Sequence, residues 1–275
     1  MSFLKVIAVD TPSLGDRSYL VHDGRQALVV DPQRDIDRIQ QLAEREGVAI
    51  AAVAETHMHN DYVSGGLVLA QEHGAEYLVS AEDPVRFARH EMRDRDVVNV
   101  GRFAVQAIHT PGHTFTHLSY SLLDPAGVAQ GVFTGGSLLH GSTGRPDLLG
   151  AEHASTLAGL QHGSAHRISE LLEAETPIYP THGFGSFCAA TPTSGNSSTI
   201  GDERRMNPAL LLEREAFIKE TLSGLDAFPT YYRHMGPANH AGPAPIDLSM
   251  LPRADRAAIE RAIAAGAWGV DLRHR

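Results

Sequence analysis

The stretch THMHNDY, residues 56–62, places three side chains of metal-binding type at alternate positions: His57, His59 and Asp61. In an extended chain alternate side chains point to the same side, so these three can converge on one ion. Imidazoles and carboxylates are ligands that zinc, iron and manganese take in proteins. The apolar run before the cluster predicts a buried strand over 48–56, whose end presents it. The spacing therefore predicts a metal site.

Three later loops carry further candidates. HTPGHTFTH (109–117) offers His113 after a Pro-Gly turn, TGGSLLHGSTGRPDLLG (134–150) is rich in glycine, and YPTHGFGSFC (179–188) offers His182 and Cys188. Each follows a predicted strand, and α/β folds place their chemistry in such loops because a rigid sheet holds an exposed backbone there. We predict that His57, His59 and His113 form a three-histidine site with an open position for water or substrate.

The elements that must position these loops follow from hydrophobic periodicity and turn residues. Strands are predicted at 3–9, 18–23, 26–31, 48–56, 75–80, 103–110, 117–124, 127–135 and 177–183. Helices are predicted at 35–47, 64–74, 152–174 with breaks at Gly159 and Gly163, 207–223 and 253–266. The Gly/Pro-rich stretch 234–245 is interpreted as a linker, and 267–275 as a strand. This alternation predicts a layered α/β protein.

The composition narrows the class of function. The 275 residues are 42% hydrophobic, enough for a sizeable core, and 33 acidic against 23 basic side chains give a net charge of −10. Such a charge disfavours nucleic acids and anionic membranes as partners, so a small molecule is expected. No signal peptide or membrane-spanning run is recognisable, and the single cysteine fits a reducing compartment. We expect a cytoplasmic protein.

The quoted residues, in this order and spacing, resemble the metallo-β-lactamase superfamily, whose pattern is HxHxDH followed by a distant His, an Asp and a His. The resemblance covers about residues 3–230. THMHNDYVSG, HTPGHTFTHLSY, GRPDLLG and YPTHGFGSFC look most like the persulfide dioxygenase branch, especially forms with rhodanese domains behind the metal domain. The resemblance implies a four-layer αββα sandwich over 1–230, a linker, a helix and the start of a truncated rhodanese domain over 231–275, and a homodimer. Alternatively, the last helix and strand pack on the main domain.

Two positions depart from that pattern, because Tyr62 replaces a histidine and Gly136 replaces the bridging aspartate. The second metal of the superfamily would need both, together with Asp61 and His182. At most one metal is therefore expected. The family resemblance implies Fe(II), with Zn(II) as the alternative.

In the persulfide dioxygenases that one iron is held by two histidines and one aspartate, and the resemblance places the histidines at His57 and His113. Gly136 supplies no ligand atom, so another group must complete the set. Asp61, His140, Asp147 and water are the substitutes considered. Restoring the carboxylate with Gly136→Asp is expected to tighten metal binding.

The remaining site residues have two interpretations each. Cys188 and Tyr62 are the candidate catalytic side chains, and Cys188 either relays a sulfane sulfur or is an inert buried thiol. Arg145 resembles the substrate-side arginine of the family, which would bind a glutathione-like thiol persulfide, or it pairs with Asp147. Three functions remain: a persulfide dioxygenase that releases sulfite, a metal-dependent thioester hydrolase, and a weakened sulfur-binding or scaffold domain.

Overall fold

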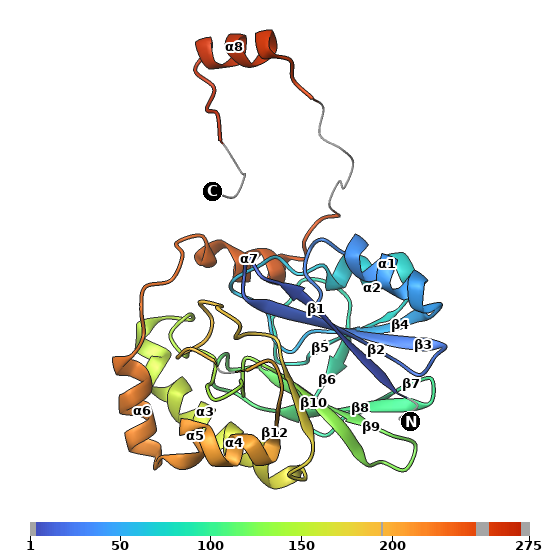
Figure 1. Ribbon diagram of the computed structural model, residues 1–275, viewed down its shortest axis with the longest axis vertical. Helices are drawn as coiled ribbons and strands as arrows, with labels where there is room; N and C mark the ends of the chain where they lie inside the picture. Colours follow the sequence, from blue (N-terminus) through green and yellow to red (C-terminus); the bar gives the residue numbers. More distant parts are fainter. Residues whose placement is uncertain (1–3, 194, 246–252, 271–275) are drawn as a thin grey trace. The chain divides into compact units, whose positions relative to one another are not determined.

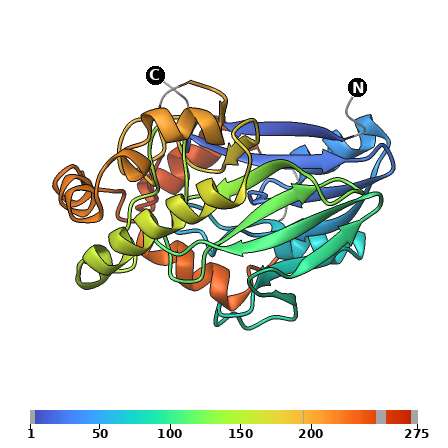
Figure 2. The ribbon, with the colours of Figure 1, turned by 90° about the horizontal axis from the view of Figure 1, so that it is seen from below.

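The computed structural model describes residues 4–193, 195–245 and 253–270, and it divides into two compact units, one up to Pro245 and one from Ile246. The first unit contains two six-stranded sheets, packed face to face with helices on both outer sides (Figures 1 and 2). This arrangement is the four-layer αββα sandwich that was expected. Among the described residues, no helix is long and apolar enough to cross a membrane.

The first sheet has its strands in sequence order: β1 (Lys5–Thr11), β2 (Asp16–His22), β3 (Gln26–Val30), β4 (Ala49–Ala54), β5 (Glu76–Ser80) and β6 (His90–Met92). Strands β3 to β6 are parallel. Their crossovers include α1 (Asp37–Glu46) and α2 (Gly66–His73), which pack on the outer face. Alternation places Leu28 and Val30 between the sheets and Ala27 and Val29 under the helices.

The second sheet has the order β12 (Ser198–Thr199), β11 (Pro177–Pro180), β10 (Ala129–Gly135), β9 (Leu118–Leu123), β8 (Phe103–His109) and β7 (Val97–Val100). Only β10 and β11 pair in parallel within it; the other neighbours are antiparallel. Its outer side is covered by α3 (Ala151–Leu171), α4 (Ile200–Met206), α5 (Pro208–Leu211) and α6 (Arg214–Ser223). The parallel strands of both sheets end on the same edge of the sandwich. The candidate metal ligands His57, His59 and His182 lie directly after those ends.

Two helix predictions need correction. Helix α3 is continuous through both glycines, and the guanidinium of Arg214 occupies the space that a Cβ on Gly159 would fill. The helix predicted over 207–223 is two helices, because Leu212 and Glu213 are extended. Strands β6 and β7 and helix α4 were not predicted.

The predicted linker over 234–245 is wrong. Most of this stretch belongs to helix α7 (Tyr232–Ala241), which is part of the first unit. The buried side chain of Asn239 donates to the carbonyls of His59 and Tyr62, at 2.8 and 2.9 Å, and accepts from the amide of Ser64 at 2.9 Å. Helix α7 therefore fixes the loop after β4 that carries His57 and His59. The compact unit ends at Pro245, beyond the predicted boundary at residue 230.

The second unit contains α8 (Arg256–Ala264), which the sequence predicts; Asp255 caps it by accepting from the amide of Ala258 at 2.7 Å. Residues 267–270 are not strand, and the rest of the strand predicted over 267–275 lies outside the described residues. Trp268 is 93% exposed. The rhodanese start stays a prediction.

We predict that Asn239→Ala lowers the free energy of unfolding by about 2–4 kcal/mol, because it leaves two buried carbonyls and one amide without partners. Urea unfolding followed by circular dichroism measures the change. His234→Ala is the control, since His234 is an exposed residue of the same helix. Equal stability of the two variants would contradict the holding role of Asn239.

Candidate metal centre

Five buried imidazoles meet at the shared edge of the two sheets. His57 and His59 follow β4, His113 and His117 lie in the turn between β8 and β9, and His182 follows β11. The ring of His57 lies 4.1 to 5.2 Å, centroid to centroid, from each of the other four. His117 was not among the predicted site residues, although the Pro-Gly turn after Thr110 brings it back beside His113.

The proton of His57 is fixed by a chain of hydrogen bonds. Its Nδ1 lies 2.9 Å from the hydroxyl of Thr56, and that hydroxyl donates to Asp31 Oδ2 at 2.7 Å. The hydroxyl must therefore accept from His57, which places the ring proton on Nδ1. The Nε2 lone pair of His57 is left facing the cluster.

His113 and His182 are fixed in the same way. Nδ1 of His113 donates to the carbonyl of Arg145 at 2.9 Å, and Nδ1 of His182 donates to Asp16 Oδ1 at 3.0 Å. Both rings therefore present Nε2 as a lone pair. Burial lowers the pKa of His57, His113 and His182, which keeps all three imidazoles neutral.

Two of the three lone pairs meet directly. Nε2 of His57 and Nε2 of His182 are 3.2 Å apart, and Nε2 of His113 is buried without a hydrogen-bond partner. Two nitrogens that bind one ion at bonds of about 2.1 Å lie roughly 3.0–3.4 Å apart at octahedral to tetrahedral angles. The spacing of His57 and His182 thus fits two ligands of one metal ion, and a ligand atom of His113 lies within 4.8 Å of one of His182.

The structure places His182 at the centre of the predicted ligands. Among the described residues, potential ligand atoms lie within 4.8 Å of one another in four groups, and three of these share His182. The three are His57 with His59 and His182, His113 with His182 and Cys188, and Asp16 with Asp61 and His182. The loop after β11 is therefore central to the site, and the ligand set of His57, His59 and His113 stays a prediction.

Two carboxylates hold His59 through one ring nitrogen. Its Nε2 lies 3.3 Å from Asp31 Oδ1 and 3.3 Å from Glu55 Oε2, and all three side chains are buried. Burial lowers the pKa of His59, but the two carboxylates outweigh burial and raise it to about 10 in the metal-free protein. Nδ1 of His59 is buried without a hydrogen-bond partner, so a metal that displaces its proton can still use this nitrogen. Glu55 was not among the predicted site residues.

Tyr62 supports His59. The two rings stack with centroids 4.3 Å apart, and the Tyr62 hydroxyl donates to the carbonyl of Asp31 at 3.3 Å. These contacts are those of a side chain that positions its neighbours. They give no support to the predicted catalytic role of Tyr62.

Asp61 and Cys188 lie together on the other side of His182. Asp61 Oδ2 is 3.5 Å from His182 Nδ1, and burial, together with the nearby carboxylate of Asp16, raises the pKa of Asp61 to about 7. The Cys188 thiol is fully buried beside Asp61 and the hydroxyl of Tyr232 in α7. Burial raises the pKa of Cys188, so without a metal the thiol keeps its proton.

Gly136 departs from the family pattern for a steric reason that the structure makes visible. A Cβ at this position would lie 2.3 Å from Cδ2 of His113, and the Gly136 amide donates to Nε2 of His117 at 3.0 Å. The His113 imidazole thus fills the space of a side chain at 136. The expectation that Gly136→Asp tightens metal binding stays untested, but this steric contact favours the opposite outcome.

Of the two roles predicted for Arg145, the structure shows the pairing with Asp147. Its guanidinium makes two hydrogen bonds to the carboxylate of Asp147, at 2.7 and 2.8 Å, and a third to the carbonyl of Asp226 at 2.7 Å. Arg145 is 3% exposed and lies over the ring of Phe228. The charge is already paired, so Arg145 fixes its loop, and Asp147 is not available as a ligand.

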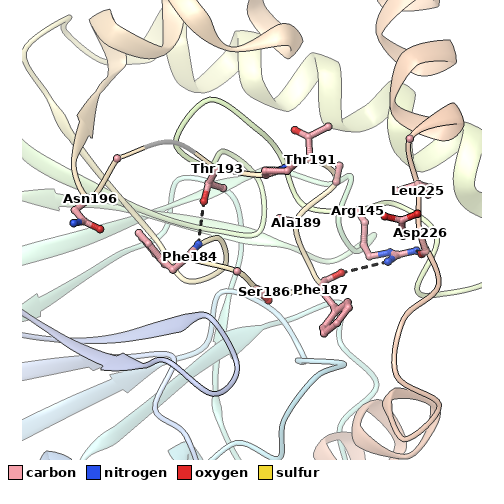
Figure 3. Close-up of a pocket in the computed structure, with 15 residues that line it drawn as sticks. Arg145, Phe184, Ser186, Phe187, Ala189, Thr191, Thr193, Asn196, Leu225 and Asp226 are labelled. Atoms are coloured by element: carbon pink, nitrogen blue, oxygen red, sulfur yellow. Dashed lines mark hydrogen bonds between the residues drawn. The ribbon is translucent and has the colours of Figure 1, made fainter.

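A cavity of about 560 Å³ opens next to this loop, lined by parts of 184–196 and 224–226 together with Arg145 (Figure 3). Phe184, Ser186 and Phe187 border it. Ser186 also contacts Asp16, the partner of His182, and accepts from the amide of Cys188 at 3.2 Å. The segment that follows His182 thus forms both a wall of the cavity and a wall of the histidine cluster.

An αββα sandwich with a buried multi-histidine centre at the strand ends defines a class of metalloprotein. The sequence profile of the metallo-beta-lactamase superfamily matches residues 17–182, so the chain belongs to that superfamily. It is 31% identical to the human mitochondrial persulfide dioxygenase ETHE1 over 219 residues, which are 79% of this chain and 77% of that protein.

Two crystal structures share the fold. A metallo-beta-lactamase from Staphylococcus aureus has a TM-score of 0.82 at 29% identity and matches over 90% of this chain and 75% of its own. ETHE1 from Myxococcus xanthus has a TM-score of 0.74 at 28% identity over 86% of this chain and 98% of its own. Both likenesses agree with the fold that the sequence predicted.

We predict that Gly136→Asp and Gly136→Ala both weaken metal binding by at least about tenfold, because either Cβ displaces the ring of His113. Isothermal titration with Zn(II) measures the affinity. The alanine variant carries the steric change without the carboxylate and is therefore the matched control. Tighter binding by the aspartate variant alone would show that His113 moves aside and that the family ligand set is restored.

A second prediction concerns pH. A carboxyl whose pKa is raised on folding contributes stability that is complete below its ordinary pKa of 3.8 and is lost as pH rises through about 7. Asp61→Asn should therefore gain stability over the wild type, by about 4 kcal/mol at pH 8 and far less at pH 5. Urea unfolding with a chelator present measures both proteins, and a difference that does not change with pH would contradict the raised pKa.

Proposed function

We propose that this protein binds one metal ion through Nε2 of His57, His113 and His182 and uses it to oxidise the outer sulfur of a low-molecular-weight thiol persulfide. The observations that carry the metal assignment are the 3.2 Å between Nε2 of His57 and Nε2 of His182, the ligand atoms of His113 and His182 within 4.8 Å of each other, and the use of all three Nδ1 protons by other groups. The sulfur assignment is supported by the likeness to human persulfide dioxygenase and by the thiol of Cys188 beside the cluster.

The reaction would convert a persulfide, oxygen and water into the thiol, sulfite and two protons. The outer sulfur gains three oxygen atoms, two from oxygen and one from water, and its bond to the inner sulfur breaks. The outer sulfur gives up the four electrons that reduce oxygen, and a ferrous ion held by the cluster would supply the one-electron chemistry that lets oxygen react with it.

The protein's own contribution is binding and orientation. Thr56, Asp16 and the carbonyl of Arg145 hold the three imidazoles in one protonation state. The burial of the cluster excludes bulk water from the reacting sulfur. We propose the cavity beside Ser186 as the place where the carrier thiol binds. A homodimer stays a prediction, to be checked by light scattering.

The second candidate is a metal-dependent hydrolase acting on a thioester, with zinc-bound hydroxide as the nucleophile. The likeness to a metallo-beta-lactamase from Staphylococcus aureus is in line with hydrolysis. Tyr62 and Gly136 count against it, because a dinuclear centre would need ligand atoms at both positions.

Metal content of protein purified without oxygen, together with oxygen uptake and sulfite release on adding glutathione persulfide, tests the proposal. We expect about one iron per chain and uptake that stops in the absence of persulfide. One zinc, thioester cleavage and no uptake would favour the hydrolase. No bound metal would overturn both and leave a sulfur-binding or scaffold domain.

Variants locate the ligands. His113→Gln and His182→Gln should lose most of the bound metal, since each removes one of three nitrogens from the centre. His140→Gln is the matched control, because His140 is also buried but lies outside the four ligand groups found among the described residues. Loss of metal from His140→Gln alone would place the ion elsewhere.

A further inference from the structure

We infer that Cys188 is a ligand of the metal, and that its thiolate supplies the anionic charge that the family pattern places at position 136. This inference rests on the proposed function, because it requires a metal at the histidine cluster. It assigns a ligand that lies on a different loop from the missing carboxylate. The observation that carries it is the group formed by Cys188 Sγ and the ring nitrogens of His113 and His182, all within 4.8 Å of one another.

The backbone fixes the thiol and the His113 imidazole to each other. The amide of Arg145 donates to the carbonyl of Cys188 at 2.8 Å, while the carbonyl of Arg145 accepts from Nδ1 of His113 at 2.9 Å. One residue thus holds both groups. On the other side, the hydroxyl of Ser186 accepts from the Cys188 amide and keeps the turn after His182 closed.

A second, independent observation points to a ligand at this place. Nε2 of His113 is fully buried and has no hydrogen-bond partner, and both oxygens of the adjacent, buried Asp61 also lack one. Buried polar atoms are normally paired, so unpaired atoms around one point mark a site for a bound group. A cation there would satisfy the nitrogen and compensate the carboxylate.

Charge favours a thiolate ligand. Three neutral imidazoles leave both charges of a divalent ion uncompensated in a buried site, and one anionic ligand removes half of that excess. On binding, the S–H bond of Cys188 is replaced by a sulfur–metal bond, and the proton leaves to the buffer without any change of oxidation state. Soft sulfur with imidazole selects iron, zinc or cobalt over magnesium and calcium. A coordinated Cys188 is not free to relay sulfur.

Cobalt(II) substitution tests this directly. Cys188 is the single cysteine of the chain, so a thiolate-to-cobalt charge-transfer band in the near ultraviolet can come from no other residue. We expect the wild type to bind one Co(II) and show this band. X-ray absorption of the zinc form should show one sulfur at about 2.3 Å among nitrogen neighbours at about 2.0–2.1 Å.

Two variants complete the design. Cys188→Ser should lose the band completely and bind Co(II) at least about tenfold more weakly. His113→Gln should also bind more weakly but keep the band, because the thiolate remains. His140→Gln should match the wild type in both respects.

The outcomes separate the two proposals. One bound Co(II) without a thiolate band would overturn the ligand role of Cys188 and leave the histidine metal site intact. Failure of Co(II), Zn(II) and Fe(II) to bind at all would overturn the proposed function and, with it, the inference. The wild-type spectrum decides between these results even if Cys188→Ser does not fold.

Discussion

The carboxylate of Asp31 is the interaction on which the rest of the site depends. It lies directly after β3, is fully buried, and accepts from the amide and hydroxyl of Thr56 and from the hydroxyl of Thr181. Thr56 lies just after β4 of the first sheet, and Thr181 lies just after β11 of the second. The Asp31 side chain therefore joins both sheets where the histidine-bearing loops begin. A buried carboxylate is stable only when such donors and a cation surround it, and the imidazolium of His59 is that cation.

The orientation of the ligands follows from this carboxylate. Because the Thr56 hydroxyl donates its hydrogen bond to Asp31, it can only accept from Nδ1 of His57. The Nε2 lone pair of His57 therefore faces the histidine cluster. Thr181 places the next residue, His182, opposite it. His59 therefore belongs to the support of the site, and Tyr62 and Asn239 hold it there from two further directions.

Most strands and helices of the sandwich could be predicted from the sequence, but helix α7, which packs on the loop after β4, could not. Strands such as β3 are buried on both faces, and the sequence shows them as continuous apolar runs. Helix α7 was missed because Gly236 and Pro237 have low helix propensity, and its stability comes from tertiary contacts such as those of Asn239. Local pattern carries no information about a partner 180 residues away in the chain.

The same limit applies to the site. His57, His113 and His182 were recognisable as ligand types, but the hold of Asp31 and Glu55 on His59 was not, because no spacing rule connects these carboxylates with it. Arg145 was recognised by its motif, yet its charge is used by Asp147 and the carbonyl of Asp226. In both cases the residue type was informative and the pairing was not.

Gly136 shows why a missing ligand is not simply a lost function. A carboxylate there would need the space that the ring of His113 occupies, and the Gly136 amide is already used by His117. The packing of the His113 ring against this turn thus leaves no room for an aspartate unless the ring moves, while His182 and Cys188 approach from the opposite loop. A buried divalent ion requires charge compensation wherever its ligands come from. Moving the anionic group from one strand end to another would satisfy that requirement and leave the fold unchanged.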